Sequence, residues 1–186
     1  MTSNETYLVQ AKSMFAAGHA KESIELFTKA GEEGCNPVTV YLSRGAAFLT
    51  IGEVDKSIDD FNRVLKIDDN NDRAYYYRGL AHLKNNAFNN AVQDLTASIT
   101  LNHERGAAFF ARGLAYAELD RTDESLRDMK TAIVFSNKEV EGFARMFGEN
   151  RTLFGKSMAL LEGERGPWAT VMNEDEVSKL KKWIEK

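Results

Sequence analysis

The chain has 186 residues, of which 43% are hydrophobic and 28% are charged, and its net charge is −4. This composition is typical of a folded globular protein and excludes an intrinsically disordered one. The acidic balance offers no electrostatic surface for nucleic acid. No stretch approaches the roughly 18 apolar residues that a membrane span needs, so we expect neither nucleic acid nor membrane as a partner.

The single cysteine, Cys35, cannot form an internal disulfide. An oxidising compartment is therefore not needed for stability. The first ten residues lack a basic segment followed by an apolar stretch, so no signal peptide is predicted. We therefore expect the protein in the cytoplasm.

From the N-terminus onward, one fixed period organises most of the chain. The dipeptide Arg-Gly occurs at residues 44–45, 78–79 and 112–113, separated by the same interval each time. An aromatic, a small and a large apolar residue recur in the same register. These sets are Tyr7, Ser23 and Phe27; Tyr41, Ser57 and Phe61; Tyr75, Ala91 and Leu95; and Phe109, Ser125 and Met129. A period of this length, about 34 residues, indicates stacked supersecondary units.

Each unit is predicted to contain two helices. In the second unit, the apolar residues follow the three-and-four spacing of an amphipathic helix on both sides of a break. Turn-forming residues mark this break in each unit, at Gly18, Gly52, Asn85-Asn86 and Asp120. A lone hairpin leaves an apolar face in water, so the units are expected to stack. The glycine in each first helix is predicted to allow close approach of the adjacent helix.

These positions resemble the signature of the tetratricopeptide repeat family. In the second unit the matching residues are Tyr41, Gly45, Phe48, Ser57, Phe61 and Val64. The first unit matches less well, with Ala11 at the glycine position and Met14 at the aromatic position. The resemblance implies an all-α fold, a right-handed superhelix of antiparallel helical hairpins (an α-solenoid). It places four repeats at about residues 4–37, 38–71, 72–105 and 106–137.

Beyond residue 137 the register fades. Apolar spacing over residues 138–161 predicts a degenerate fifth hairpin, and residues 162–172 are predicted to be a linker. A last helix is predicted over residues 173–186, with Asn173 as its N-cap and Glu176 three residues later. This helix caps the open end of the array or, in the alternative interpretation, reaches back into the groove as a built-in ligand.

In the resembling family, the first helix of each hairpin lines a concave groove. The residues one step past the inward-packing positions form an apolar row at Leu8, Leu42, Tyr76 and Phe110, with two further rows beside it. The predicted peptide-binding residues are Leu8, Lys12, Phe15, Leu42, Leu49, Arg73, Tyr76, Leu80, Leu83, Phe110 and Leu114. A row of apolar side chains facing water usually marks an interaction site. The competing interpretation is that they pack against neighbouring helices.

The sequence therefore predicts a scaffold that binds a protein or peptide in this groove, with Lys12, Arg73 and Lys84 available to fix its orientation. The alternative is a self-assembly module that forms a homo-oligomer through the groove or an open end. The positions of the family's chaperone-tail clamp hold only two basic residues, Lys12 and Arg73, and no asparagine, so a terminal carboxylate is expected to bind poorly.

No catalytic or metal site is predicted. The histidines at positions 19, 82 and 103 lack a second ligand at metal-binding spacing, and Cys35 lies in no catalytic motif. Acidic pairs such as Asp59-Asp60 and Asp68-Asp69 are expected to be solvated surface. We therefore expect neither enzymatic activity nor a cofactor.

Overall fold

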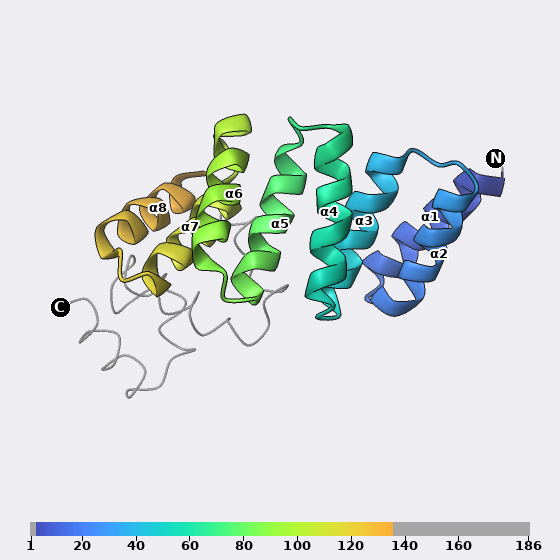
Figure 1. Cartoon of the computed structure of the whole chain (residues 1–186), viewed down its shortest axis with the longest axis horizontal. Helices are drawn as coiled ribbons and strands as arrows, with labels where there is room; N and C mark the ends of the chain where they lie inside the picture. Colours follow the sequence, from blue (N-terminus) through green and yellow to red (C-terminus); the bar gives the residue numbers. More distant parts are fainter. Residues whose placement is uncertain (1–2, 136–186) are drawn as a thin grey trace. The chain divides into compact units, whose positions relative to one another are not determined.

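The computed structural model describes residues 3–135 (Figure 1). Within that range it contains eight α-helices and no strand, which confirms the all-α class. The predicted fifth hairpin at 138–161, the linker at 162–172 and the terminal helix at 173–186 lie outside the described residues. None of the helices in residues 3–135 combines the length and the apolar character that crossing a bilayer requires.

The chain divides into two compact units, residues 1–103 and residues 104–186. The N-terminal unit holds three helical hairpins, and Figure 1 shows the two helices of each running in opposite directions. They are α1 (Ser3–Ala16) with α2 (Ala20–Glu32), α3 (Pro37–Thr50) with α4 (Val54–Ile67), and α5 (Asp72–Lys84) with α6 (Phe88–Leu101). In the C-terminal unit, α7 (Gly106–Glu118) and α8 (Thr122–Phe135) form one hairpin. The predicted helical hairpins are thus confirmed.

The turn inside each hairpin uses the same backbone conformation. Gly18 and Gly52 have φ angles of +90° and +85°, and Asn86 and Asp120 have φ angles of 56° and 57°. This left-handed conformation favours glycine, and asparagine and aspartate tolerate it better than other residues with side chains. The turns predicted from these residues are confirmed, and their conformation recurs with the period of the sequence.

Helices α3 and α5 each begin at an asparagine cap. The Oδ1 atom of Asn36 accepts a hydrogen bond from the backbone N–H of Thr39 at 3.0 Å, and Pro37 occupies the first turn of α3. At the start of α5, Oδ1 of Asn71 accepts from the N–H of Ala74 at 3.0 Å. Each cap satisfies a backbone donor that the first helical turn leaves without a partner. The caps therefore fix where α3 and α5 start.

A helical glycine allows the two helices of a hairpin to approach closely. A Cβ atom built on Gly45 would lie 2.7 Å from Cε1 of Phe61, and one on Gly79 would lie 2.7 Å from Cγ of Leu95. Both large side chains are fully buried. Gly113 of the C-terminal unit is similarly restricted, with its nearest contact at 3.1 Å. The packing role predicted for these glycines is confirmed.

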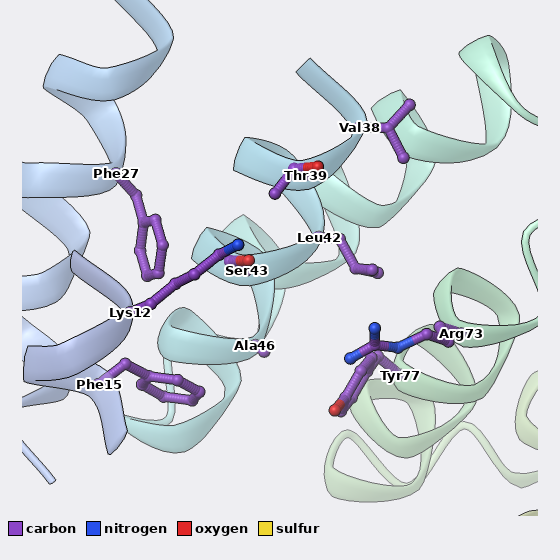
Figure 2. A pocket seen from close by; sticks show the side chains of 10 residues that line it. All are labelled: Lys12, Phe15, Phe27, Val38, Thr39, Leu42, Ser43, Ala46, Arg73 and Tyr77. Atoms are coloured by element: carbon purple, nitrogen blue, oxygen red, sulfur yellow. The ribbon is translucent and has the colours of Figure 1, made fainter. Parts of the chain in front are cut away.

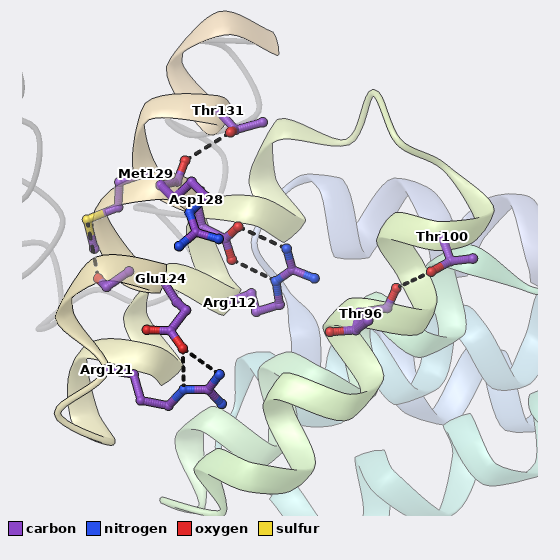
Figure 3. A network of polar contacts seen from close by, with 10 residues as sticks. Thr96, Thr100, Arg112, Arg121, Glu124, Asp128, Met129 and Thr131 are labelled. Atoms are coloured by element: carbon purple, nitrogen blue, oxygen red, sulfur yellow. Dashed lines mark hydrogen bonds and ion pairs between the residues drawn. The ribbon is translucent and has the colours of Figure 1, made fainter.

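A buried ion pair joins the two helices of a hairpin beside each of these glycines. The pairs are Arg44–Asp60, Arg78–Asp94 and Arg112–Asp128. In the first pair, Nε and Nη2 of Arg44 donate to the two carboxylate oxygens of Asp60, both at 2.8 Å. Figure 3 shows the same bidentate geometry for Arg112 and Asp128 within the C-terminal unit.

These pairs overturn one expectation from the sequence. The acidic pattern predicts solvated surface at Asp60, yet this residue is 3% exposed. The hydrogen bonds to Asp60 raise the pKa of Arg44 above its usual value, although burial opposes this. A charge can be buried at this point because the bidentate partner replaces the water that each group loses.

Candidate functional site

A cavity of about 490 Å³ opens in the N-terminal unit between α1, α3 and α5 (Figure 2). The first helix of each of the three hairpins in this unit contributes to its wall, and of the lining residues only Phe27 comes from a second helix. The lining residues are Lys12 and Phe15 of α1, Phe27 of α2, Val38, Thr39, Leu42, Ser43 and Ala46 of α3, and Arg73 and Tyr77 of α5. Its volume is in the range of cavities that bind ligands in proteins.

Helical spacing explains why these residues share one surface. On α3 the lining positions are 38, 39, 42, 43 and 46, which lie three and four residues apart. Residues at this spacing occupy one face of a helix. Lys12 and Phe15 on α1 follow the same rule, as do Arg73 and Tyr77 on α5. The cavity is thus where one face from each of three equivalent helices of the repeat meets.

The cavity carries positive charge over an apolar floor. Lys12 enters from the side of α1 and Arg73 from the side of α5 (Figure 2), and both side chains are exposed. Neither forms an ion pair with another described residue, and no acidic side chain lines the cavity. Phe15 and Leu42 are half-buried, so part of each apolar surface is open to a ligand. The site can therefore hold an apolar group and, beside it, an oxygen acceptor.

One wall of the cavity is rigid. The ring of Tyr77 stacks on that of Phe61, with 5.8 Å between centroids and 14° between planes. Tyr76 packs against it from another side at 5.2 Å. Because Phe61 is itself fully buried, Tyr77 is held in one orientation. A preorganised wall reduces the side-chain entropy that a ligand must remove on binding.

The structure brings together four of the predicted peptide-binding residues, namely Lys12, Phe15, Leu42 and Arg73. Two other predicted residues, Leu8 and Leu83, are half-buried but do not line the cavity. Leu8 packs instead with Phe15 against a buried cluster in the first hairpin.

The remaining predicted residues are buried, although the sequence analysis expected them to face water. Leu49 and Leu80 are fully buried and Tyr76 is 7% exposed. In the C-terminal unit, Phe110 is fully buried and Leu114 is 8% exposed. For Leu49 and Leu80 this agrees with the competing interpretation, in which the row packs against neighbouring helices. Their role in binding stays a prediction.

The burial of Phe110 has a reason in the composition of its helix. Helix α7 contains eight buried residues and reads Gly-Ala-Ala-Phe-Phe-Ala over its first six positions. A helix that is apolar all round is covered on every side rather than on one. The residue after the inward-packing Phe109 is therefore the buried Phe110 on α7. On α3, the residue after Tyr41 is Leu42, which lines the cavity.

Of the other six lining residues, Ala46 belongs to one of the two further apolar rows, and Ser43 and Tyr77 are polar positions on the same helix faces. The remaining three, Phe27, Val38 and Thr39, escaped the analysis of the sequence. Val38 and Thr39 lie one turn before Leu42, so extending the predicted row backwards by three and four positions would have found them. Phe27 lies on a second helix, and no signal in the first helices points to it.

Lys84 is not available to orient a ligand as expected. Its Nζ atom donates to the backbone carbonyl oxygen of Leu49 at 3.1 Å, which ties α5 to the last turn of α3. Burial lowers the pKa of Lys84. Among residues 3–135 no group of three or more histidine, cysteine, aspartate or glutamate side chains could hold a metal ion.

Residues 45–86 match the model of the TPR repeat family. This segment of the chain is a tetratricopeptide repeat. The matched segment runs from Gly45 of α3 to Asn86, which follows α5 and has a positive φ angle. Helical hairpins of the same kind occur on both sides of it. A comparison with curated protein sequences found no match.

Solved structures of tetratricopeptide proteins share this fold. A thermophilic TPR protein of Thermus thermophilus is 15% identical, with a TM-score of 0.68 over 99% of this chain and 100% of that one. A crystal structure of MamA is 21% identical, with a TM-score of 0.63 over 94% of this chain and 92% of that one. The second TPR of Spaghetti, bound to the HSP90 peptide SRMEEVD, is 24% identical, with a TM-score of 0.53 over 57% of this chain and 98% of that one.

Proposed function

We propose that the protein is a scaffold that binds a segment of another protein in the cavity between α1, α3 and α5. The observation that supports this most is the composition of the cavity wall. Half-buried Phe15 and Leu42 leave apolar surface open, and two exposed cations stand beside it with no acid in the lining. Tetratricopeptide repeats serve as protein-binding scaffolds, and one similar structure holds a bound peptide.

The cavity favours a segment with an apolar anchor. An apolar side chain of the partner would fill the space above Phe15 and Leu42, where its burial contributes about 25 cal/mol per Å². Arg73 and Lys12 would then donate hydrogen bonds to carbonyl or carboxylate oxygens of the same segment and fix its direction. An amphipathic helix or an extended peptide satisfies both requirements.

A chaperone C-terminus remains a poor fit. Of the positions that would clamp a terminal carboxylate, Lys12, Ser43, Arg73 and Tyr77 line the cavity, and Leu8 does not. None of these positions holds an asparagine amide. We therefore expect the apolar floor to determine which partner binds and the two cations to orient it. We infer that the protein acts in this way as a non-enzymatic scaffold in the cytoplasm.

Selection of binding peptides tests the proposal. A library of random peptides is displayed against the intact chain, and the Kd of the best synthetic peptide is measured for the wild type and three variants. We expect Leu42→Ser to weaken binding about tenfold, equivalent to about 1.4 kcal/mol, because the partner's anchor loses its apolar contact. Arg73→Ala should weaken it to a similar degree.

The control is Met14→Ser. Met14 is 40% exposed on α1 but does not line the cavity, so this change should leave the Kd unaltered. Unchanged affinity in both Leu42→Ser and Arg73→Ala would show that the selected peptides bind elsewhere and would refute the proposal.

Self-assembly is the second candidate, and one observation favours it. Val9 and Met14 on α1 are 51% and 40% exposed, which leaves apolar surface on the first hairpin for a second copy. Light scattering over a concentration series decides the matter. A molar mass that rises with concentration, and falls back in Val9→Ser with Met14→Ser, supports self-assembly. A constant monomer mass eliminates it.

A further inference from the structure

A second cavity, of about 330 Å³, lies in the N-terminal unit and shares no residue with the first. It opens where the end of α2 passes the start of α3 and the middle of α4. The lining residues are Thr28, Gly31 and Glu32 of α2, Cys35 of the connection, Pro37, Val40, Tyr41 and Arg44 of α3, and Arg63 of α4.

This cavity depends on residues that the repeat does not require. A Cβ atom on Gly31 would lie 3.3 Å from Cγ1 of Val40, so the missing side chain lets Val40 of α3 approach α2 closely at the wall of the cavity. One repeat later, Leu65 stands at the position equivalent to Gly31, and Ala97 at the position equivalent to Arg63. The next hairpin therefore has a bulky side chain where this one has none, and a methyl group where this one has a guanidinium.

The two arginines of the cavity differ in what they bind. All three guanidinium nitrogens of Arg44 are used, because Nε and Nη2 donate to Asp60 and Nη1 donates to Oγ1 of Thr28 at 3.0 Å. Arg63 forms no ion pair or side-chain hydrogen bond with a described residue. Its guanidinium lies instead against the ring of Tyr41, whose centroid is 5.3 Å from Cζ.

Tyr41 orients the guanidinium of Arg63. Arg44 lies against the same ring, with Cζ 5.6 Å from its centroid, and the bonds to Asp60 fix Arg44 in turn. A guanidinium held against an aromatic ring keeps its donor edge free to bind a carboxylate with two parallel hydrogen bonds. Glu32 also lines the cavity but forms no ion pair with Arg63.

We propose that this second cavity binds an acidic side chain of a partner protein together with an apolar side chain next to it. The carboxylate pairs with Arg63, and the apolar neighbour packs beside Gly31, against Pro37. The charge complementarity resides in Arg63, since the charge of Arg44 is balanced by Asp60. The proposal is independent of the first cavity, because the two share neither residues nor cations.

The single cysteine provides a direct readout. Cys35 is half-buried and lines this cavity, and the chain has no other thiol to react. The intact chain is alkylated with iodoacetamide in the presence of the tripeptide Phe-Glu-Phe with both ends blocked. At a peptide concentration of about three times its Kd, the alkylation rate should fall about fourfold, because about a quarter of the sites remain open. The matched peptide Phe-Gln-Phe, which lacks the charge, should protect far less.

Three variants test the assignment. Arg63→Gln should abolish the protection, whereas Glu32→Gln should retain or strengthen it because a like charge is removed. Arg73→Ala, in the first cavity, should leave the protection unchanged. A far-ultraviolet circular dichroism spectrum checks that each variant is folded. Absence of protection in the wild type, equal protection by both peptides, or full protection in Arg63→Gln would each overturn the proposal.

Discussion

The first two hairpins of the N-terminal unit reach the same architecture with different contacts. Phe27 and Phe61 occupy equivalent positions on α2 and α4, and both are fully buried. In the second hairpin Phe61 packs on Gly45, where a Cβ atom would lie at 2.7 Å. In the first hairpin the equivalent residue is Ala11, which is fully buried with its Cβ in place.

The two hairpins also differ in charge. Arg44 and Asp60 join α3 to α4, whereas the equivalent residues of the first hairpin are Gln10, which is exposed, and Leu26, which is half-buried. The glycine and the ion pair therefore occur together, and both are missing from the first hairpin. The comparison teaches that the repeat period specifies the hairpin, while the glycine and the ion pair are one of two ways to fill the contact between its helices.

Removing one partner of the ion pair should have the largest effect. Asp60→Leu copies the first hairpin at one position and leaves Arg44 half-buried without its carboxylate. Breaking such a pair costs about 3 kcal/mol, so we expect a fall of that size in the free energy of unfolding in urea.

The double variant Arg44→Gln with Asp60→Leu copies both positions of the first hairpin and leaves no unpaired charge. It should recover most of the loss, to within about 1 kcal/mol of the wild type. If the double variant is as unstable as Asp60→Leu alone, the two hairpins are not interchangeable solutions and the comparison fails.

Exchanging glycine and alanine at this position should destabilise either hairpin, but for different reasons. Gly45→Ala drives a methyl group into Phe61, and overpacking of a core costs about 1–3 kcal/mol, although the better helix propensity of alanine offsets about 1 kcal/mol of it. The reverse change, Ala11→Gly, should cost only the propensity and the small cavity, about 1–2 kcal/mol. Chemical denaturation measures both, and a Gly45→Ala variant more stable than the wild type would contradict the role of close approach.

The turns should respond alike in both hairpins. Gly18 and Gly52 share the left-handed conformation, in which a Cβ atom costs about 1 kcal/mol, so Gly18→Ala and Gly52→Ala should lose similar amounts of stability. Asn86→Gly is the matched control in the third hairpin and should be neutral or stabilising. Unequal losses at positions 18 and 52 would show that more than the turn distinguishes the two hairpins.

The smallest effect should be a dependence on pH that His82 adds in the third hairpin. Burial lowers the pKa of His82; nearby Asp94 opposes the shift and Arg78 adds to it. A histidine with a lowered pKa binds fewer protons when folded than when unfolded. Stability should therefore decline as the pH falls below about 6.5, the unfolded value, and stay constant above it with respect to this group. His82→Phe, which copies Phe48 of the second hairpin, should flatten this part of the pH profile.

The sequence predicts the hairpins and their turns well, because both arise from local rules that recur in every repeat. Gly52 and Asn86 mark turns through their own backbone preference, and helical spacing needs no knowledge of neighbours. It also predicts four cavity residues, among them Leu42 and Arg73, from the register of the first helices. These are features that a single helix determines.

Contacts between helices are harder to predict. Arg44 and Asp60 lie far apart in the sequence, on different helices, so neither residue alone indicates the pair; the recurrence of aspartate at positions 60, 94 and 128 is the signal that could have found it. The burial of Leu80 and Phe110 depends on which elements cover their helices. The spacing of residues within one helix gives no information about those elements. The second cavity depends on Gly31, an irregularity in the repeat that a search for recurring residues passes over.

Photocrosslinking tests the central claim, that a partner segment binds between α1, α3 and α5. A diazirine side chain is introduced in place of Thr39, which lines the first cavity, and in a second variant in place of Lys66, which is exposed on α4 and does not line it. The selected peptide is irradiated with each variant and the adducts are quantified by mass spectrometry. We expect a strong adduct at position 39 and background at position 66. Equal labelling at both positions, or labelling at position 66 alone, would contradict the assignment of this cavity as the binding site.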